Sequence, residues 1–132
     1  MKAWPIFLLM VALVMPCALM LAEQKNAVPK YDPAAENIFK GTVQEVRDRE
    51  CPMSKGLGSH LVLKLDDGTT IEVHLAPSKF VKAYDLTFNK GDELEVTGTK
   101  VRFEDVDTIF AREVKRGNDV FVFRDKEGRP VW

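Results

Sequence analysis

The chain has 132 residues, of which 45% are hydrophobic and 30% are charged. This length and this balance allow one globular domain, and they exclude an intrinsically disordered chain, a collagen and a coiled coil. Nineteen Lys and Arg residues against twenty Asp and Glu residues give a net charge of -1, so the overall charge does not require a polyanionic partner such as nucleic acid.

The amino-terminal segment is apolar, and we expect it to direct export. Residues 3–22 contain no acidic or basic side chain, and the apolar run over residues 6–15 ends at Pro16, where the cleavage region of a secretory signal would begin. We therefore predict that residues 1–22 are a signal peptide, cleaved after Ala22, and that the protein is periplasmic or secreted. An inner-membrane anchor is the alternative, because about 20 apolar residues can span a bilayer. Membrane contact is expected only through residues 3–22, if they stay uncleaved.

Only one of the two cysteines follows the expected cleavage site. Pro16 directly before Cys17 disfavours lipoprotein processing, because the motif for that processing resembles one with a small residue at this position. The processed chain would keep Cys51 alone and would have no internal disulfide. A lone thiol in an oxidising compartment is buried, bound to a metal, paired with another chain or left reactive.

The folded part of the chain is expected to begin near Asn37. Residues 23–36 carry two prolines and few large apolar side chains, which predicts an extended linker before a single domain over residues 37–132. Alternating side chains over residues 38–46 predict a first strand. The polar, glycine-containing segment 48–59 is expected to be a flexible loop.

Two further strands are predicted after this loop, joined by a turn that contains Gly68. Their apolar faces consist of Leu61, Leu63 and Leu65 on one strand and Ile71, Val73 and Leu75 on the other. The register that we predict from these faces sets Lys64 opposite Glu72. It also makes His60 a diagonal neighbour of His74 on the outward face.

The second half of the chain predicts one short helix and three strands. Pro77 suits the first position of a helix, and Phe80 and Tyr84 recur at helical spacing, so we expect both rings to be core residues that plug one end of the fold. The remaining strands are expected at residues 93–101 with a bulge at Gly98, at about 108–114, and at 119–124.

The order of strand, strand, strand, short helix, strand, strand resembles the OB-fold over about residues 37–114. The segment 88–98, with sequence FNKGDELEVTG, is similar to the start of the fourth strand in many such proteins. We therefore expect an all-β fold with one short helix, an OB-fold-like Greek-key barrel of five to six strands preceded by a hydrophobic leader. The leader, the segment 74–77 and the tail 123–132 also resemble small exported bacterial OB-fold proteins of the periplasm. That resemblance implies a binding module with no established ligand.

We predict an exported binding or adaptor module of the bacterial envelope, without catalytic activity and without a cofactor. Its expected partner is a protein or a small molecule of the cell envelope. The sequence shows neither a nucleophile held by a base nor a pair of carboxylates that would flank a substrate. The outward surface of the first three strands is the expected ligand-binding face, with residues Lys40, Thr42, His60, Val62, Lys64, Glu72 and His74.

The alternative function is a periplasmic metal-binding protein for copper or zinc. Thiolate, thioether and imidazole groups are donors that copper(I), and in part zinc, prefer. The candidate ligands are Cys51, Met53, His60 and His74. Their spacing matches no strong metal motif, and outward histidines on a strand pair are commonly just solvated. A further alternative is binding of single-stranded nucleic acid, although we expect no nucleic acid for a nearly neutral exported domain.

Overall fold

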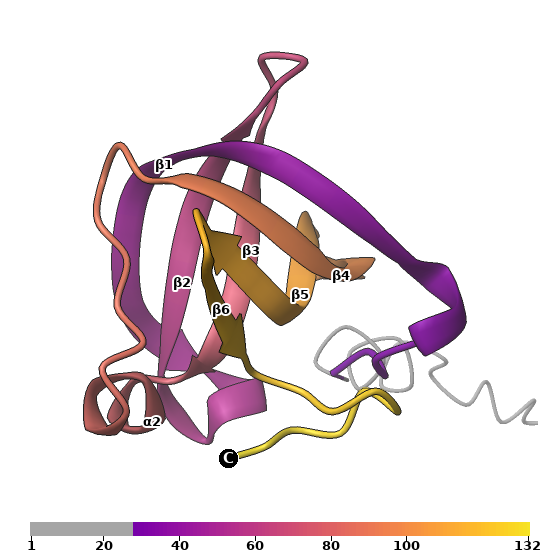
Figure 1. Ribbon diagram of the computed structural model, residues 1–132. Helices are drawn as coiled ribbons and strands as arrows, with labels where there is room; N and C mark the ends of the chain where they lie inside the picture. Colours follow the sequence, from indigo (N-terminus) through magenta and orange to yellow (C-terminus); the bar gives the residue numbers. More distant parts are fainter. Residues whose placement is uncertain (1–27) are drawn as a thin grey trace, which may run out of the picture.

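The structure is a computed structural model that describes residues 28–132 (Figure 1). The expected signal peptide, Cys17 and the first part of the expected linker lie outside the described residues, so cleavage after Ala22 and the alternative membrane anchor stay predictions. No helix within the described part is both long and apolar enough to cross a membrane.

The described chain consists mostly of strands. In chain order the elements are η1 (Pro33–Ala35), β1 (Glu36–Cys51), η2 (Pro52–Ser54), β2 (Gly56–Leu65), β3 (Thr70–Pro77), α2 (Ser78–Ala83), β4 (Glu93–Phe103), β5 (Val106–Arg116) and β6 (Asp119–Val122). The predicted class, all-β with one short α-helix, is confirmed, and the strands and the helix follow one another in the predicted order. The predicted bulge at Gly98 is present as a register shift between β4 and β5.

The strands form one six-stranded sheet in the order β3-β2-β1-β4-β5-β6. A parallel pairing between β3 and β5, with Val73 opposite Ile109, joins five of these strands into a closed ring, and β6 lies outside it along β5. The long, bent β1 makes the ring possible because its first half pairs with β4 and its second half with β2 (Figure 1). Gly41 lies where the two pairings meet, and a Cβ atom there would collide with the carbonyl oxygen of Lys64.

The register between β2 and β3 differs from the predicted one by two residues. Lys64 lies opposite Thr70, Val62 lies opposite Glu72, and His60 lies directly opposite His74 instead of diagonally. The reason is the tight turn, in which Leu65 N–H donates to Thr69 at 2.8 Å and Gly68 adopts a φ of 86°, a conformation that glycine tolerates. A shift of two residues keeps every side chain on its predicted face.

The prediction that residues 48–59 form a flexible loop is wrong. β1 continues to Cys51, β2 begins at Gly56, and the two strands pair along this whole stretch, from Asp48 opposite Ser59 to Cys51 opposite Gly56. Most side chains of residues 44–50 are exposed, so this ribbon has few buried apolar residues to mark it as a strand. A two-stranded ribbon with polar surfaces therefore resembles a loop in its sequence.

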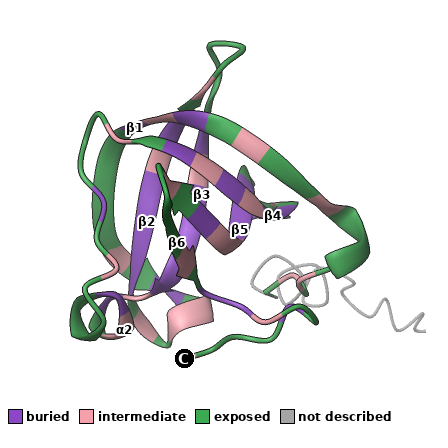
Figure 2. Ribbon diagram, in the orientation of Figure 1, coloured by how far each residue is buried: buried purple, intermediate pink, exposed green. Residues whose placement is uncertain are grey.

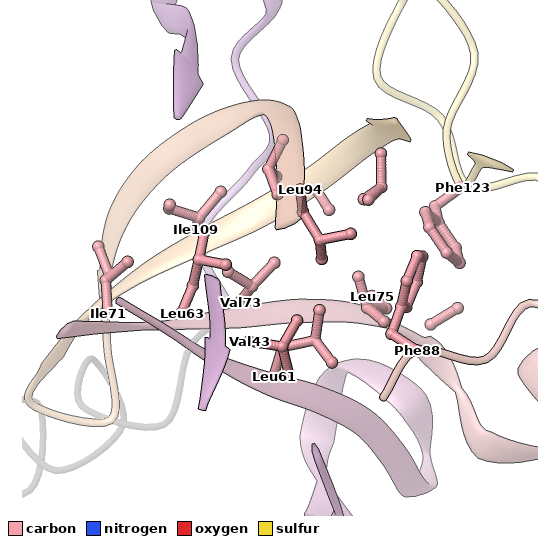
Figure 3. Close-up of a cluster of buried hydrophobic side chains, with 14 of the residues drawn as sticks. Val43, Leu61, Leu63, Ile71, Val73, Leu75, Phe88, Leu94, Ile109 and Phe123 are labelled. Carbon is pink, nitrogen blue, oxygen red and sulfur yellow. The ribbon is translucent and has the colours of Figure 1, made fainter. Parts of the chain in front are cut away.

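The core lies inside the ring of strands, where the predicted apolar faces meet (Figures 2 and 3). Leu61, Leu63, Val73 and Leu75 are at most 1% exposed, which confirms the faces predicted for β2 and β3. Figure 3 shows further side chains of the same cluster, among them Val43, Phe88, Leu94, Ile109 and Phe123. Burial of this set, which comes from five strands and from the segments around Phe88 and Phe123, stabilises the closed arrangement through the hydrophobic effect.

The short helix is correct in position but only partly correct in its packing. Pro77 is the N-cap residue and not the first helical residue, and α2 ends at Ala83. Phe80 packs against the core and lies near Trp132, but Tyr84 is 68% exposed because it caps the helix at its carboxyl end. The prediction that Tyr84 is a core residue is therefore wrong.

A second buried cluster covers part of the outer surface of the ring. It consists of Cys51, Phe103 and Phe110, with Tyr31, Met53 and Val101 packed against it. These residues come from the far end of β1, from β4 and β5, from η2 and from the segment before η1. The cluster removes from solvent a part of β3 that strand alternation alone would leave exposed, and it positions the candidate site.

Candidate metal centre

His60 and His74 form a buried, stacked pair. They lie opposite each other on β2 and β3, their ring centroids are 3.8 Å apart, and each residue is 1% exposed. Phe103 and Phe110 flank His74, with ring centroids at 5.4 Å and 5.6 Å. The expectation that these histidines are solvated is wrong. They do point away from the main core, but the second cluster closes over them.

Cys51 brings a thiol to the same place. It is the last residue of β1, is 2% exposed, and has its Sγ atom 3.7 Å from Nδ1 of His74. The ligand atoms of Cys51, His60 and His74 all lie within 4.8 Å of one another. Burial raises the pKa of the Cys51 thiol, while backbone hydrogen bonds from Met53 and Ser54 act in the opposite direction. Those two amides would stabilise a thiolate once a cation replaces the proton.

Glu72 orients the histidines from the other side. Its Oε1 atom is 2.8 Å from Nδ1 of His60 and 3.4 Å from Nε2 of His74. Nε and Nη2 of Arg49 donate to the same oxygen, at 3.0 Å and 2.7 Å, and Nη1 of Arg49 reaches Glu104 at 3.1 Å. Carboxylates that accept from the second nitrogen of a ligating histidine fix its tautomer and its orientation.

The pKa shifts of this group favour neutral histidines beside an ionised carboxylate. Burial and the neighbouring His60 lower the pKa of His74 to about 3. Burial also lowers the pKa of His60, in spite of its hydrogen bond to Glu72. Burial would raise the pKa of Glu72, but hydrogen bonds from Arg49 and His60 outweigh it, and the pKa is lowered. Neutral imidazole is the form that binds metals.

The backbone of Gly58 lies close against the nitrogen of His60 that faces away from Glu72. Nε2 of His60 and Oγ of Ser54 are buried, and neither has a hydrogen-bond partner among the described residues. A Cβ atom on Gly58 would lie 2.9 Å from that Nε2, 2.8 Å from that Oγ and 3.1 Å from Cβ of Cys51. Buried polar atoms without partners are rare in proteins, and a bound ion would supply the missing partner for His60.

The residues of this site lie within a segment that matches a known protein family. A model of the MamS/MamX magnetosome protein family matches residues 35–121, about two thirds of the chain. The chain belongs to this family. No curated protein matches it. A small bacterial family is thus confirmed, whereas the match does not extend to a periplasmic OB-fold family.

All residues of the site described so far fall inside the segment matched by the magnetosome family. Met53, the fourth predicted ligand, also lies in this segment, and its sulfur already accepts a hydrogen bond. It is partly buried against the second cluster, and its Sδ atom accepts from Nη2 of Arg124 at 3.5 Å. Arg124 itself is 7% exposed and lies outside the matched segment.

The residues of the predicted ligand-binding face separate into two places in this magnetosome family domain. His60, His74 and Glu72 belong to the candidate metal centre. Lys40 and Thr42 line a shallow pocket of about 370 Å³ at the other end of β1, together with Asp66, Leu94, Lys115 and other residues. Lys64 is exposed opposite Thr42, and Val62 is partly buried opposite Glu72.

Three arginines near the carboxyl end are engaged in ion pairs or packed against aromatic rings. Arg112 pairs with Glu36 at 2.6 Å, Arg116 pairs with Asp92 at 3.1 Å, and Arg124 packs over the rings of Tyr31, Phe110 and Trp132. These contacts give each of the three arginines a structural role within the magnetosome family domain.

Sequence analysis missed Arg49, Ser54, Gly58 and Glu104 as parts of the site. One signal could have revealed Arg49, because it precedes Cys51 by two residues, and such residues project from the same face of a strand. Ser54 and Gly58 lay in the stretch that we predicted as a flexible loop. Glu104 lies in the β4–β5 turn, and only the folded chain brings it to Arg49.

Proposed function

We propose that this chain is an exported, non-catalytic member of the magnetosome family that binds one transition-metal ion through Cys51, His60 and His74. The observation that carries the proposal is the convergence of one buried thiol and two buried imidazoles within 4.8 Å of one another. Thiolate and imidazole are the donors of copper and zinc sites. The orphaned Nε2 of His60 fits a metal ligand better than it fits a packed core histidine.

The residues of the site have distinct roles in this proposal. Glu72 accepts from Nδ1 of His60, so that the lone pair of that ring lies on Nε2, the nitrogen beside Gly58. Arg49 keeps Glu72 ionised and in place. Cys51 loses its proton to solvent on binding, which makes metal affinity depend on pH.

A non-catalytic role is proposed because the three donors are shielded from solvent. Catalytic zinc sites keep one coordination position open for water or substrate. Cys51, His60 and His74 are each at most 2% exposed, and two phenylalanine rings flank His74. Such a site suits the holding or transfer of an ion. The proposed location in the cell envelope rests on the apolar leader over residues 3–22.

An adaptor function remains the second candidate because of the shallow pocket beside Lys40 and Thr42. A protein or small-molecule ligand of the envelope would bind there, and Lys64 lies opposite Thr42 on the neighbouring strand. Binding at this pocket would not require the metal centre. Substitution of Lys40 therefore separates the two candidates, since it leaves all three metal donors unchanged.

Metal titration of the full-length exported protein tests the proposal. Copper(I) and Zn²⁺ would be added without oxygen, and the bound metal per chain would be measured for the wild type, Cys51→Ser and His74→Gln. Phe103→Leu is the matched control, because it alters the same buried cluster but removes no donor. We expect one ion per chain in the wild type and the control, and a loss in the two donor variants. Equal binding by all four proteins would refute the site.

A further inference from the structure

The three proposed donors are one ligand short of a complete zinc centre. Cys51, His60 and His74 offer one sulfur and two nitrogens, whereas zinc in proteins is almost always bound by four ligands. Each of the three residues is at most 2% exposed, so bulk solvent does not reach the donors. A fourth ligand is therefore expected from a side chain of the folded protein.

Among the polar atoms near the donors, the hydroxyl of Ser54 is the free one. Oε1 of Glu72 already accepts two hydrogen bonds from Arg49. Sδ of Met53 already accepts one from Arg124. Oγ of Ser54 is buried and has no hydrogen-bond partner within the part of the chain that the structure describes. Such an atom is rare in a folded protein, and a bound ion would give it a partner.

The turn that follows β1 directs this hydroxyl toward the thiol. Cys51 is the N-cap residue of η2, and Ser54 is the third residue of that turn. A side chain at this position points back toward the cap residue. The backbone amides of Met53 and Ser54 also favour the ionised form of the Cys51 thiol. Residues 51 and 54 have the spacing of the C-x-x-C turns of zinc sites, with serine in place of the second cysteine.

The same hydroxyl lies beside a second donor, His60. Oγ of Ser54 and Nε2 of His60 lie 2.8 Å and 2.9 Å from a single point, the position that a Cβ atom on Gly58 would take. Cβ of Cys51 lies 3.1 Å from that point. Nε2 of His60 is also buried and without a partner among residues 28–132. Two unpartnered atoms from η2 and β2 thus converge next to the thiol, as two ligands of one ion would.

We infer that Ser54 is the fourth ligand of the proposed centre when it holds zinc, an inference that rests on the proposed metal-binding function. On binding, the thiol proton of Cys51 leaves to solvent and a zinc–sulfur bond forms. The hydroxyl of Ser54 keeps its proton and binds through an oxygen lone pair, and no electron is transferred. A neutral hydroxyl is a weaker ligand than a thiolate. The centre therefore releases zinc more readily than a centre with two thiolates, which suits transfer of the ion.

Replacement of Ser54 tests this inference. The full-length protein is kept reduced with a phosphine, loaded with Co²⁺ as a spectroscopic probe, and titrated with Zn²⁺ against a chelator of known affinity. In Ser54→Cys, the thiolate-to-cobalt charge-transfer band should grow about twofold, because two thiolates then bind the ion. The Zn²⁺ affinity of Ser54→Cys should rise by at least ~10-fold. Ser54→Ala should lower the Zn²⁺ affinity by about 10-fold, because it removes the fourth ligand.

Ser59→Cys and Ser59→Ala are the matched controls. Ser59 is another buried serine of the same sheet, 4% exposed, but it lines a small cavity with Leu61 and Val81 beside α2. We expect both controls to bind Zn²⁺ with wild-type affinity and to keep the wild-type cobalt spectrum.

The other outcomes separate this inference from the proposed function. If the wild type binds Zn²⁺ but the charge-transfer band of Ser54→Cys is unchanged, Ser54 is not a ligand and the proposed function stands. Should Ser54→Cys fail to fold, Ser54→Ala decides, and wild-type affinity in that variant would overturn the inference. Equal changes in the Ser59 variants would also overturn it. Absence of metal binding by the wild type would overturn both the inference and the proposed function.

Discussion

Gly58→Ala is expected to block the proposed metal centre while leaving the fold in place. The backbone of Gly58 is not in the left-handed region, so an alanine is compatible with its conformation. The added methyl group would lie 2.9 Å from Nε2 of His60 and 2.8 Å from Oγ of Ser54, closer than ordinary contact. Overpacking of this size costs about 1–3 kcal/mol of unfolding free energy. Because the methyl occupies the space beside a ligand nitrogen, we expect metal affinity to fall by at least ~100-fold.

Leu57→Ala is the matched control for this substitution, since Leu57 is the preceding residue of β2 and is 50% exposed. Metal affinity would be measured by competition titration, and unfolding free energy by urea denaturation of the metal-free proteins. We expect Leu57→Ala to behave as the wild type in both assays. If Gly58→Ala bound metal with wild-type affinity, Nε2 of His60 would not be the ligand atom and the assignment of the site would be wrong.

Three further predictions concern the core, the change of stability at acidic pH and the orientation of the proposed ligands. Leu61→Ala should lower the unfolding free energy by about 2–5 kcal/mol, whereas the exposed Leu57→Ala should change it by about 0.5 kcal/mol or less; similar effects of both would contradict the assigned core. Burial would raise the pKa of Glu36, but hydrogen bonds from Tyr31 and Arg112 lower it below 4.5. Its stabilising contribution is therefore complete above pH 4.5 and is lost as the pH falls through the folded pKa. In urea denaturation at acidic pH, the unfolding free energy of Glu36→Gln should fall less with decreasing pH than that of the wild type. Glu72→Gln should reduce metal affinity by about 10–100-fold in a competition titration, because it weakens the orientation of both histidines; an unchanged affinity would remove Glu72 from the site.

Much of the fold could be predicted because strand alternation is a local property. The inward faces of β2 and β3, the bulge at Gly98 and the order of the elements all follow from patterns within a few residues of sequence. The register between β2 and β3 could not be predicted in the same way. It depends on how tightly the turn closes, and Gly68 in a left-handed conformation allowed a closure that shifts the pairing by two residues.

The candidate site was only partly accessible to the same reasoning. Donor chemistry identified Cys51, His60 and His74, and the pairing of β2 with β3 brought the two histidines into one region. The expectation of solvated histidines failed because their environment comes from strands far away in the sequence. Phe103 and Phe110 cover His74, and Arg49 joins Glu72 to Glu104 across separate hairpins.

The sequence by itself determined which side chains share a face, because the direction of a side chain along a strand alternates with a period of two. It also determined the donor chemistry, because that is set by residue type. Only the tertiary structure decided that the outer face of the histidine pair is dry. The pairing of β3 with β5 and the covering of that face by the second cluster are long-range contacts, and no local pattern specifies them. Burial turns two ordinary strand histidines and a thiol into a candidate metal centre, since it removes the water that would otherwise satisfy them.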